Sequence, residues 1–257
     1  KGMRGIVVPA LTLVASLALV VADELGGNMD ASGPAPKAVS SFRSAFGEAF
    51  AVILATEVGD KTFFIAAIMA MRHSRMVTWI GAVGALVVMT VLSTLVGHVA
   101  PLLIPGSRIY THYAAAVLFA VFGVRMLREG YSTSHSGASD ELEEVELELA
   151  KKQDLESNEV EGPAEFSTRV VLMQAFTLTF LAEWGDRSQI ATIALAAAKE
   201  PFGVTLGACI GHALCTGLAV VGGKLLASRI SERTVLLTGG GLFVFFAIAS
   251  FLQGPSE

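Results

Sequence analysis

Acidic residues inside otherwise apolar stretches are the feature of this sequence that could carry chemistry. A six-residue motif of the order Glu-x-Gly-Asp-base-hydroxyl occupies residues 57–62 and recurs at residues 183–188. A charged side chain at the centre of a bilayer costs at least about 2.5 kcal/mol, so such residues are retained mainly where they face one another or a water-filled cavity. Two copies of the same charged motif therefore indicate a functional site shared by two parts of the chain.

The motif supplies four carboxylates, those of Glu57, Asp60, Glu183 and Asp186. The two acids of each copy are three residues apart and therefore share one face of a helix, and the glycine between them allows the helix to unwind. Oxygen ligands of high charge suit hard cations such as Ca²⁺, Mn²⁺ and Mg²⁺, whereas thiolate or imidazole clusters would indicate zinc or copper. We predict that the four carboxylates converge on one site for a divalent cation, which is a transported ion and not a cofactor.

Competition between metal and protons is the chemistry that such a cluster predicts. Carboxylates crowded in a medium of low dielectric repel one another, so at least one is expected to bind a proton in competition with the metal. Further polar residues are expected to support the site with hydroxyl or amide oxygens, or by offsetting negative charge when no metal is bound: Thr62, Ser188, Gln189, Lys61 and Arg187.

Alternative interpretations stay open for several of these polar residues. The pairs Glu57–Lys61 and Glu183–Arg187 could be simple helix-stabilising ion pairs, although their burial in a membrane would be costly. His212 lies within a later apolar segment, where it could relay protons or be a satisfied packing residue.

Composition places most of the chain in a lipid bilayer. Of the 257 residues, 53% are hydrophobic and only 16% are charged, and the mean hydropathy is +0.62. Several apolar stretches are about 17–25 residues long, which is the length that a helix needs to cross about 30 Å of hydrocarbon. The net charge of −5 comes mainly from one polar stretch, residues 129–165, so it indicates neither a basic partner nor nucleic-acid binding.

The apolar stretches divide the chain into parts. Residues 6–22 are either a cleaved signal peptide or a short anchor helix, and a linker rich in Gly, Pro and Ser follows. Six further spans are predicted at 45–71, 77–99, 109–127, 170–198, 202–222 and 234–252. We therefore expect an all-α polytopic membrane protein with an N-terminal signal or anchor helix and linker (1–44), a first three-helix repeat (45–128), an acidic cytosolic loop (129–168) and a second three-helix repeat (169–257).

Basic residues determine the expected orientation, since cytosolic loops are enriched in Lys and Arg. If Lys1 and Arg4 are cytosolic, most other basic residues near the span ends fall on the same side only when the two halves enter the membrane from opposite sides. The two repeats are therefore expected to be inverted, with the loops around Arg108 and Lys199 on the lumenal side. In the acidic loop, apolar residues lie between the glutamates at helical spacing. We interpret this loop as a solvated linker.

The doubled motif, in a chain of two three-span halves, resembles that of the Golgi divalent cation/proton exchangers of the transmembrane protein 165 and Gdt type. The stretches 178–189 and 211–217 are also similar to that family, and the resemblance extends from about Phe42 to Leu252. It implies a secondary transporter, not an enzyme, that exchanges Mn²⁺ or Ca²⁺ for protons across the Golgi membrane and so supports glycosylation. A plastid branch shares the motif, so a plastid membrane is the alternative location.

Other functions are compatible with parts of this pattern. A passive divalent-cation channel or an exporter of organic cations could use the same scaffold, and proton coupling would distinguish the channel. An intramembrane aspartyl protease could share a proton between two acids, but its Gly-x-Gly-Asp pattern has Glu57 or Glu183 at the first glycine here, and no tyrosine precedes an aspartate. The expected partners are divalent cations, protons and the lipid bilayer, and a homodimer is left open.

Overall fold

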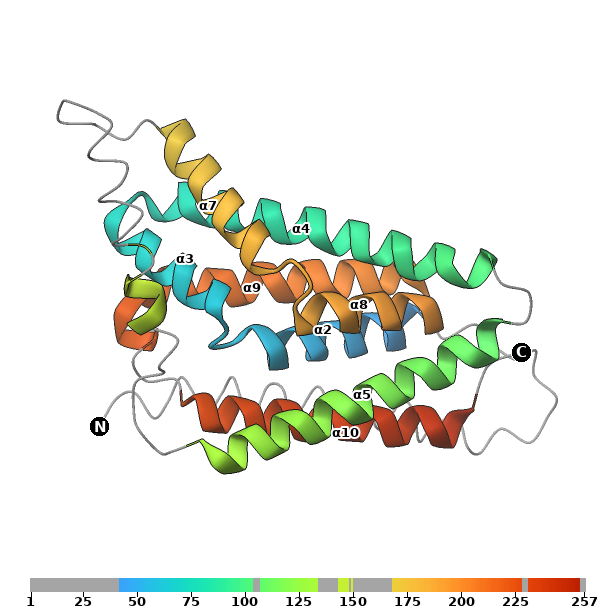
Figure 1. Cartoon of the computed structure of the whole chain (residues 1–257). Coiled ribbons are helices and arrows are strands. Elements are labelled where there is room, and N and C mark those ends of the chain that lie inside the picture. Colours follow the sequence, from blue (N-terminus) through green and yellow to red (C-terminus); the bar gives the residue numbers. More distant parts are fainter. Residues whose placement is uncertain are drawn as a thin grey trace.

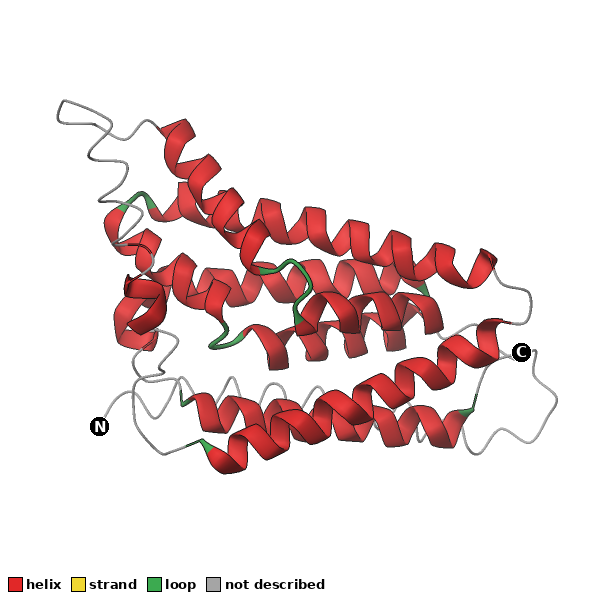
Figure 2. Cartoon of the chain, in the orientation of Figure 1, coloured by secondary structure: helices red, strands yellow, loops and turns green. Residues whose placement is uncertain are grey.

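The computed structural model describes residues 42–103, 107–133, 143–147, 149, 168–227 and 231–254. The helices in these ranges are α2 (Phe42–Glu57), α3 (Lys61–Arg72), α4 (Arg75–Val99), η2 (Ala100–Leu103), α5 (Ser107–Ser132), α7 (Thr168–Ala182), α8 (Arg187–Ala198), α9 (Pro201–Ala227) and α10 (Glu232–Gln253) (Figure 1). All regular secondary structure in the described residues is helical (Figure 2), which confirms the predicted all-α class. The predicted signal or anchor helix at residues 6–22 lies outside the described residues.

Four helical segments are long and apolar enough to cross a bilayer, namely Arg75–Leu103, Ile109–Ser132, Pro201–Gly223 and Arg233–Gln253. The chain is therefore a multi-pass membrane protein. The other two predicted core spans, 45–71 and 170–198, are each split into two shorter helices, α2 with α3 and α7 with α8. Both interruptions fall within the motif, so its acidic residues lie at helix ends and not inside continuous helices.

The helices lie roughly along one long axis, with the two interruptions near its middle (Figures 1 and 2). At one end, called the loop end, α3 ends and α4 begins beside residues 143–147; at the other, the Lys199 end, α8 ends and α9 begins. The chain runs through α2 and α3 toward the loop end, and through α7 and α8 away from it (Figure 1). Opposed chain directions are what two inverted halves require, although the repeat itself stays a prediction.

Helix α2 lies at the centre of the bundle, and all of its residues from Ala45 to Glu57 except Phe46 are buried. It packs along α9, where Gly203, Gly207 and Gly211 recur every four residues and face α2. A Cβ atom at Gly203 would come within 2.6 Å of the carbonyl oxygen of Phe42, so a glycine is needed for this approach. The close packing brings Glu57, at the end of α2, toward the middle of α9.

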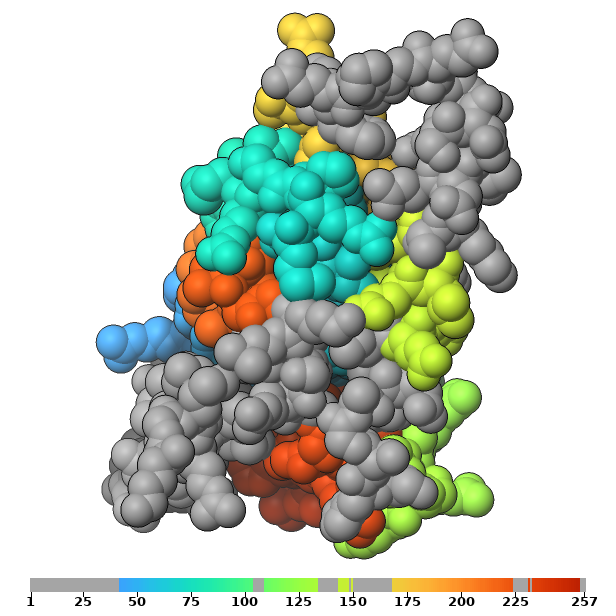
Figure 3. Space-filling model, turned by 90° about the vertical axis from the view of Figure 1, so that its left-hand side faces the viewer, coloured from blue at the N-terminus to red at the C-terminus, as the bar shows by residue number. Residues whose placement is uncertain are grey.

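Part of the acidic loop is attached to the transmembrane core, whereas we expected a solvated linker. Val145 and Leu149 are buried in an apolar cluster that also contains Phe64 of α3. Their burial removes apolar surface from water and leaves Glu144 of the same segment exposed. Figure 3, which views the loop end, shows this segment in yellow-green on the same face as the cyan residues of α3 and α4.

Candidate cation site

The two copies of the motif fold into the same tight turn between helices. Gly59 and Gly185 have φ angles of 83° and 81°, a left-handed backbone conformation that favours glycine. In each turn the amide of the aspartate donates to the carbonyl of the glutamate at 3.2 Å, and the aspartate occupies the N-cap position of the next helix. Each turn therefore places a glutamate at the end of one helix and an aspartate at the beginning of another.

Three of the four predicted carboxylates, those of Glu57, Glu183 and Asp186, approach one another closely. One ligand oxygen from each lies within 4.8 Å of the others, and only 3% of Glu57 and 2% of Glu183 are exposed. Two oxygens bound to the same Ca²⁺ at about 2.3–2.6 Å can be up to about 5 Å apart, so this spacing suits a shared cation. The three groups come from α2 and from the turn between α7 and α8, and therefore from both halves of the chain.

Each buried glutamate has one oxygen with a hydrogen-bond partner and one without. The Oε2 atom of Glu57 accepts a hydrogen bond from the hydroxyl of Thr62 at 3.4 Å, and Oε2 of Glu183 accepts one from Ser188 at 3.3 Å. The Oε1 atoms of both glutamates are buried and have no hydrogen-bond partner among the described residues. Because an unpartnered buried carboxylate oxygen is costly, a bound cation or proton is the group that would satisfy it.

His212 of α9 also lies at the site. Its Nδ1 atom is 3.6 Å from Oε2 of Glu57, and the residue is buried. The same nitrogen makes no hydrogen bond within the described part of the chain. The packing of α9 on α2 thus places an imidazole beside a carboxylate of the cluster, where a proton relay is geometrically possible and stays a prediction.

Asp60 lies outside the group of three in this structure, so the convergence of all four carboxylates stays a prediction. Its Oδ1 atom is 3.7 Å from the guanidinium of Arg187, which belongs to the other copy of the motif. The Asp60 side chain is 21% exposed, whereas Glu57 and Glu183 are almost completely buried. A base from the opposite half thus faces Asp60, as expected for a residue that offsets the negative charge of the site.

The turn before α8 is held by two polar side chains. Asp186 accepts hydrogen bonds from the backbone amides of Ser188 and Gln189, both at 2.8 Å. Gln189, a predicted supporting ligand, accepts a hydrogen bond from the amide of Gly185 at 2.7 Å, and its Nε2 atom lies 3.8 Å from the sulfur of Met89. The side-chain carbonyl of Gln189 therefore stabilises the turn in this structure.

Both bases of the motif also reach acids that the sequence analysis did not single out. The Nζ atom of Lys61 is 3.9 Å from Glu144, and a guanidinium nitrogen of Arg187 is 3.9 Å from Glu129 at the end of α5. No local pattern distinguishes these two glutamates from the other acids of the polar stretch. Only the packing of the loop end identifies them.

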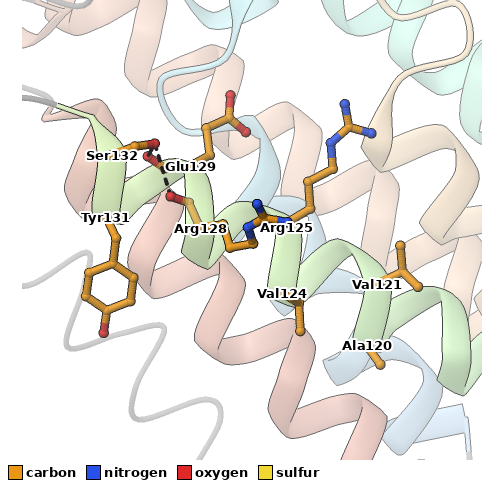
Figure 4. A pocket seen from close by; sticks show the side chains of 8 residues that line it. All are labelled: Ala120, Val121, Val124, Arg125, Arg128, Glu129, Tyr131 and Ser132. Atoms are coloured by element: carbon orange, nitrogen blue, oxygen red, sulfur yellow. Dashed lines mark hydrogen bonds between the residues drawn. The ribbon is translucent and has the colours of Figure 1, made fainter.

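A pocket of about 1070 Å³ lies on α5 at the loop end (Figure 4). Its lining consists of Glu129, two arginines and several smaller or apolar residues: Arg125, Arg128, Ala120, Val121, Val124, Tyr131 and Ser132. Since Glu129 contacts Arg187, the pocket adjoins the second copy of the motif. The side chain of Arg187 is 36% exposed and reaches Glu129, so this part of the motif is not completely buried.

Fold and site together define a class of protein, a polytopic membrane protein whose charged site is buried between two interrupted helices, as in many secondary transporters. Comparison with known proteins gives the family. The profile of the divalent cation/proton antiporter GDT1 family matches residues 45–134 and 171–257, and the chain belongs to this family. The protein is therefore a divalent cation/proton antiporter and not an enzyme, and the resemblance found from the motif is confirmed at the level of the family.

Similar proteins are known from plants. The chain is 49% identical over 238 residues to GDT1-like protein 3 of Arabidopsis thaliana, covering 90% of this chain and 77% of that protein. It is 50% identical over 212 residues to GDT1-like protein 4 of Oryza sativa subsp. indica, covering 82% and 74%. With GDT1-like protein 5 of Arabidopsis thaliana the identity is 43% over 227 residues, covering 83% and 98%. No solved structure matches the chain.

Proposed function

We propose that the protein exchanges Mn²⁺ or Ca²⁺ for protons at Glu57, Glu183 and Asp186. The observation that carries this proposal is the group of three carboxylates within 4.8 Å, in which two buried oxygens have no hydrogen-bond partner among the described residues. Ionised, such a group binds a divalent cation; protonated, it does not. The two kinds of ion thus compete for the same oxygens, which is the elementary requirement of an antiporter.

The polar neighbours have distinct proposed roles. Thr62 and Ser188 hold one oxygen of each glutamate and leave the other for the ion. Arg187 offsets the charge of Asp60, which joins the ligands only if that contact is released. The Nδ1 atom of His212, 3.6 Å from Oε2 of Glu57, is placed to receive the proton that leaves this glutamate when a cation binds.

Mn²⁺ and Ca²⁺ are the proposed substrates because carboxylate oxygens, with hydroxyl oxygens nearby, form the site. Ca²⁺ takes six to eight oxygen ligands in flexible geometry, and carboxylate sites also suit Mn²⁺. A softer ion such as Cu⁺ would favour thiolate or thioether ligands.

The loop end is proposed to face the cytosol. Basic residues gather at this end of the described helices, as cytosolic ends of membrane proteins do: Arg72, Arg75, Arg128 and Arg169. The Lys199 end then faces a lumen, which we propose to be that of the Golgi apparatus, where imported Mn²⁺ and Ca²⁺ would support glycosylation; a plastid membrane is the alternative. Residues of one chain form the site, so the proposed exchange requires no ligand from a second copy, and a homodimer stays open.

Flux measurements on proteoliposomes test the exchange. Uptake of ⁵⁴Mn and ⁴⁵Ca is measured at several imposed pH gradients, with Glu183→Gln proteoliposomes as the control. We expect cation uptake to increase when the vesicle interior is more acidic than the outside. Protons should leave the vesicles at the same time, in measurable amounts. Uptake that ignores the gradient would instead identify a passive channel, and gradient-driven flux of organic cations alone would identify an exporter of another class.

Proteolysis is the less favoured alternative from a different class. A protease of this kind needs two acids that face each other and share a proton. In the structure Asp60 faces Arg187, and Asp186 accepts hydrogen bonds from the amides that begin α8. These contacts favour charge compensation and turn formation over a shared proton between the aspartates.

A further inference from the structure

A second pair of charged residues is buried far from the carboxylate cluster. The Nζ atom of Lys199 lies 2.9 Å from Oε1 of Glu48, and the exposed fractions of the two side chains are 8% and 4%. The hydroxyl of Ser44 donates a further hydrogen bond to the same Oε1 atom at 3.0 Å. The proposed exchange chemistry uses neither charge, so the pair needs another explanation.

The position of the pair relates it to the path of the ion. Glu48 precedes Glu57 by nine residues on α2, which is about 13.5 Å along the helix axis at 1.5 Å per residue. Lys199 is the residue that follows α8, the helix that begins at the other copy of the motif. The ion pair therefore joins the two interrupted-helix units at the Lys199 end, while the cation site joins them at their middle.

The two sides of the cation site differ in accessibility. Toward the loop end, Asp60 and Arg187 have side chains that are 21% and 36% exposed. Toward the Lys199 end, Glu48 and Lys199 are almost completely buried. The site thus has partly exposed residues on its loop-end side and an almost completely buried charged pair on its other side, as expected for a site that is open toward the loop end and closed toward the Lys199 end.

The energetics of a buried ion pair suit a contact that must be reversible. Removing two charges from water costs about as much as their attraction returns, so an apolar pair of similar size holds two helices together at least as well. Once the helices separate, however, water hydrates both charges, which stabilises the separated state. An apolar pair would instead be exposed to water, which makes the separated state less favourable. A charged pair at this position is therefore better suited to a contact that opens and closes than to a permanent contact between the helices.

We propose that Glu48 and Lys199 form the gate that closes the cation site toward the Lys199 end, and that this ion pair breaks and re-forms in every transport cycle. The inference rests on the proposed exchange function and adds to it the residues that control access from one side. A permanent structural tie is the competing explanation, and the two differ in what happens when the pair is replaced by apolar residues.

The decisive variant is the double substitution Glu48→Met with Lys199→Met in the full chain. Its apolar contact is expected to keep the gate closed, so coupled ⁵⁴Mn exchange in proteoliposomes falls at least about tenfold. Mn²⁺ binding to the purified protein, followed by thermal shift, stays within about twofold of the wild type because the site remains accessible from the loop end. The double variant Glu48→Lys with Lys199→Glu swaps the two charges and keeps an ion pair, so it should have much of the wild-type flux.

A labelling experiment reports the opening of the gate without measuring transport. Thr192, a buried residue of α8 between Ser188 and Lys199, is changed to Cys after Cys209 and Cys215 are replaced by Ala. With Glu48→Gln added, a membrane-impermeant thiol reagent applied at the Lys199 end should label this cysteine several-fold faster than with the wild-type pair. The Met–Met pair should label more slowly than the wild-type pair.

His112→Met is the matched control. The ring of His112 contacts the carbonyl of Ser250 at 2.9 Å, which is a buried polar tie between α5 and α10 at the same end of the molecule but outside the interrupted helices. This variant should change neither flux nor labelling. The gate proposal would be overturned by wild-type flux in the Met–Met variant. It would also be overturned if Glu48→Gln left the labelling rate of Thr192→Cys unchanged.

Failure of the gate and failure of the exchange function are distinguishable. If the wild-type chain exchanges cations for protons and the Met–Met variant does so equally fast, the gate is wrong and the function stands. If no coupled flux is found but labelling of Thr192→Cys still responds to Glu48→Gln, the gate stands and the exchange function is wrong.

Discussion

The two glutamates of the motif are the residues on which the proposed exchange depends most. Glu57→Gln and Glu183→Gln keep the shape of the side chain but remove a negative charge and a titratable proton. Each should lower coupled ⁵⁴Mn uptake by at least about a hundredfold, since a ligand and a proton carrier are lost together. Glu143→Gln removes an exposed acidic charge and serves as the control with wild-type uptake. A glutamine variant that transports at the wild-type rate would show that the motif is structural.

The two aspartates of the motif should differ, because the structure places them in different surroundings. Asp186 belongs to the group of three carboxylates, whereas Asp60 faces Arg187. We expect Asp186→Asn to weaken Mn²⁺ binding, measured by calorimetry, by at least about tenfold more than Asp60→Asn. An equal loss of Mn²⁺ affinity in both variants would mean that Asp60 binds the cation as directly as Asp186 does, as the sequence alone suggested.

Proton competition gives the site a defined dependence on pH. Protonation removes the charge that binds the metal, so the Kd for Mn²⁺ should rise as the pH falls, by up to about tenfold per pH unit for each proton displaced. Calorimetry between pH 8 and pH 5.5 in two buffers of different ionisation enthalpy measures both the Kd and the number of protons released. A Kd that does not change over this range would argue against a shared site.

At the residue scale, sequence reasoning singled out the proposed ligands but not their partners. The cost of charge in a membrane is enough to single out Glu57, Glu183 and His212, because each lies in an apolar stretch. That Glu129 and Glu144 contact the motif bases could not be predicted, since these contacts depend on how the end of α5 and the acidic segment pack at the loop end. The contact between Asp60 and Arg187 likewise requires the two turns to be placed side by side.

At the scale of the elements, the two turns depend on glycine. A Cβ atom at Gly185 would meet no other atom within 4 Å, so the effect of Gly185→Ala comes from its positive φ alone. We expect a loss of about 1–2 kcal/mol in stability, seen as a lower Tm, together with weaker Mn²⁺ binding. Gly241→Ala is the matched control: space is equally open there, but the residue lies within α10, where alanine favours the helix.

Four of the six predicted core spans coincide with single long helices, because the bilayer imposes one simple rule. Each apolar stretch must satisfy its own backbone hydrogen bonds, and a helix of sufficient length does so. The interruption of two spans could be suspected from Gly59 and Gly185, but the left-handed turns themselves are visible only in the structure. The docking of Val145 and Leu149 could not be predicted, since the apolar surface that receives them is formed largely by α3.

At the scale of the whole molecule, the proposed orientation can be tested directly. Tyr131, at the end of α5, and Phe202, at the start of α9, are both exposed and lie at opposite ends of the molecule. Cysteines placed at these positions in a cysteine-free background should react with an impermeant maleimide from opposite sides of the membrane, residue 131 from the cytosolic side. Labelling of both positions from one side would exclude two inverted halves.

Helix ends also shape the site. Glu57 is the last residue of α2 and Glu183 follows the last residue of α7, so two C-terminal ends meet at the carboxylates. The aligned peptide dipoles of a helix give its C-terminus roughly half a negative charge, and the opposite charge at the starts of α3 and α8 is met by Asp60 and Asp186. The helix C-termini therefore add to the negative potential that attracts a cation only while the two aspartates offset the positive helix starts beside them.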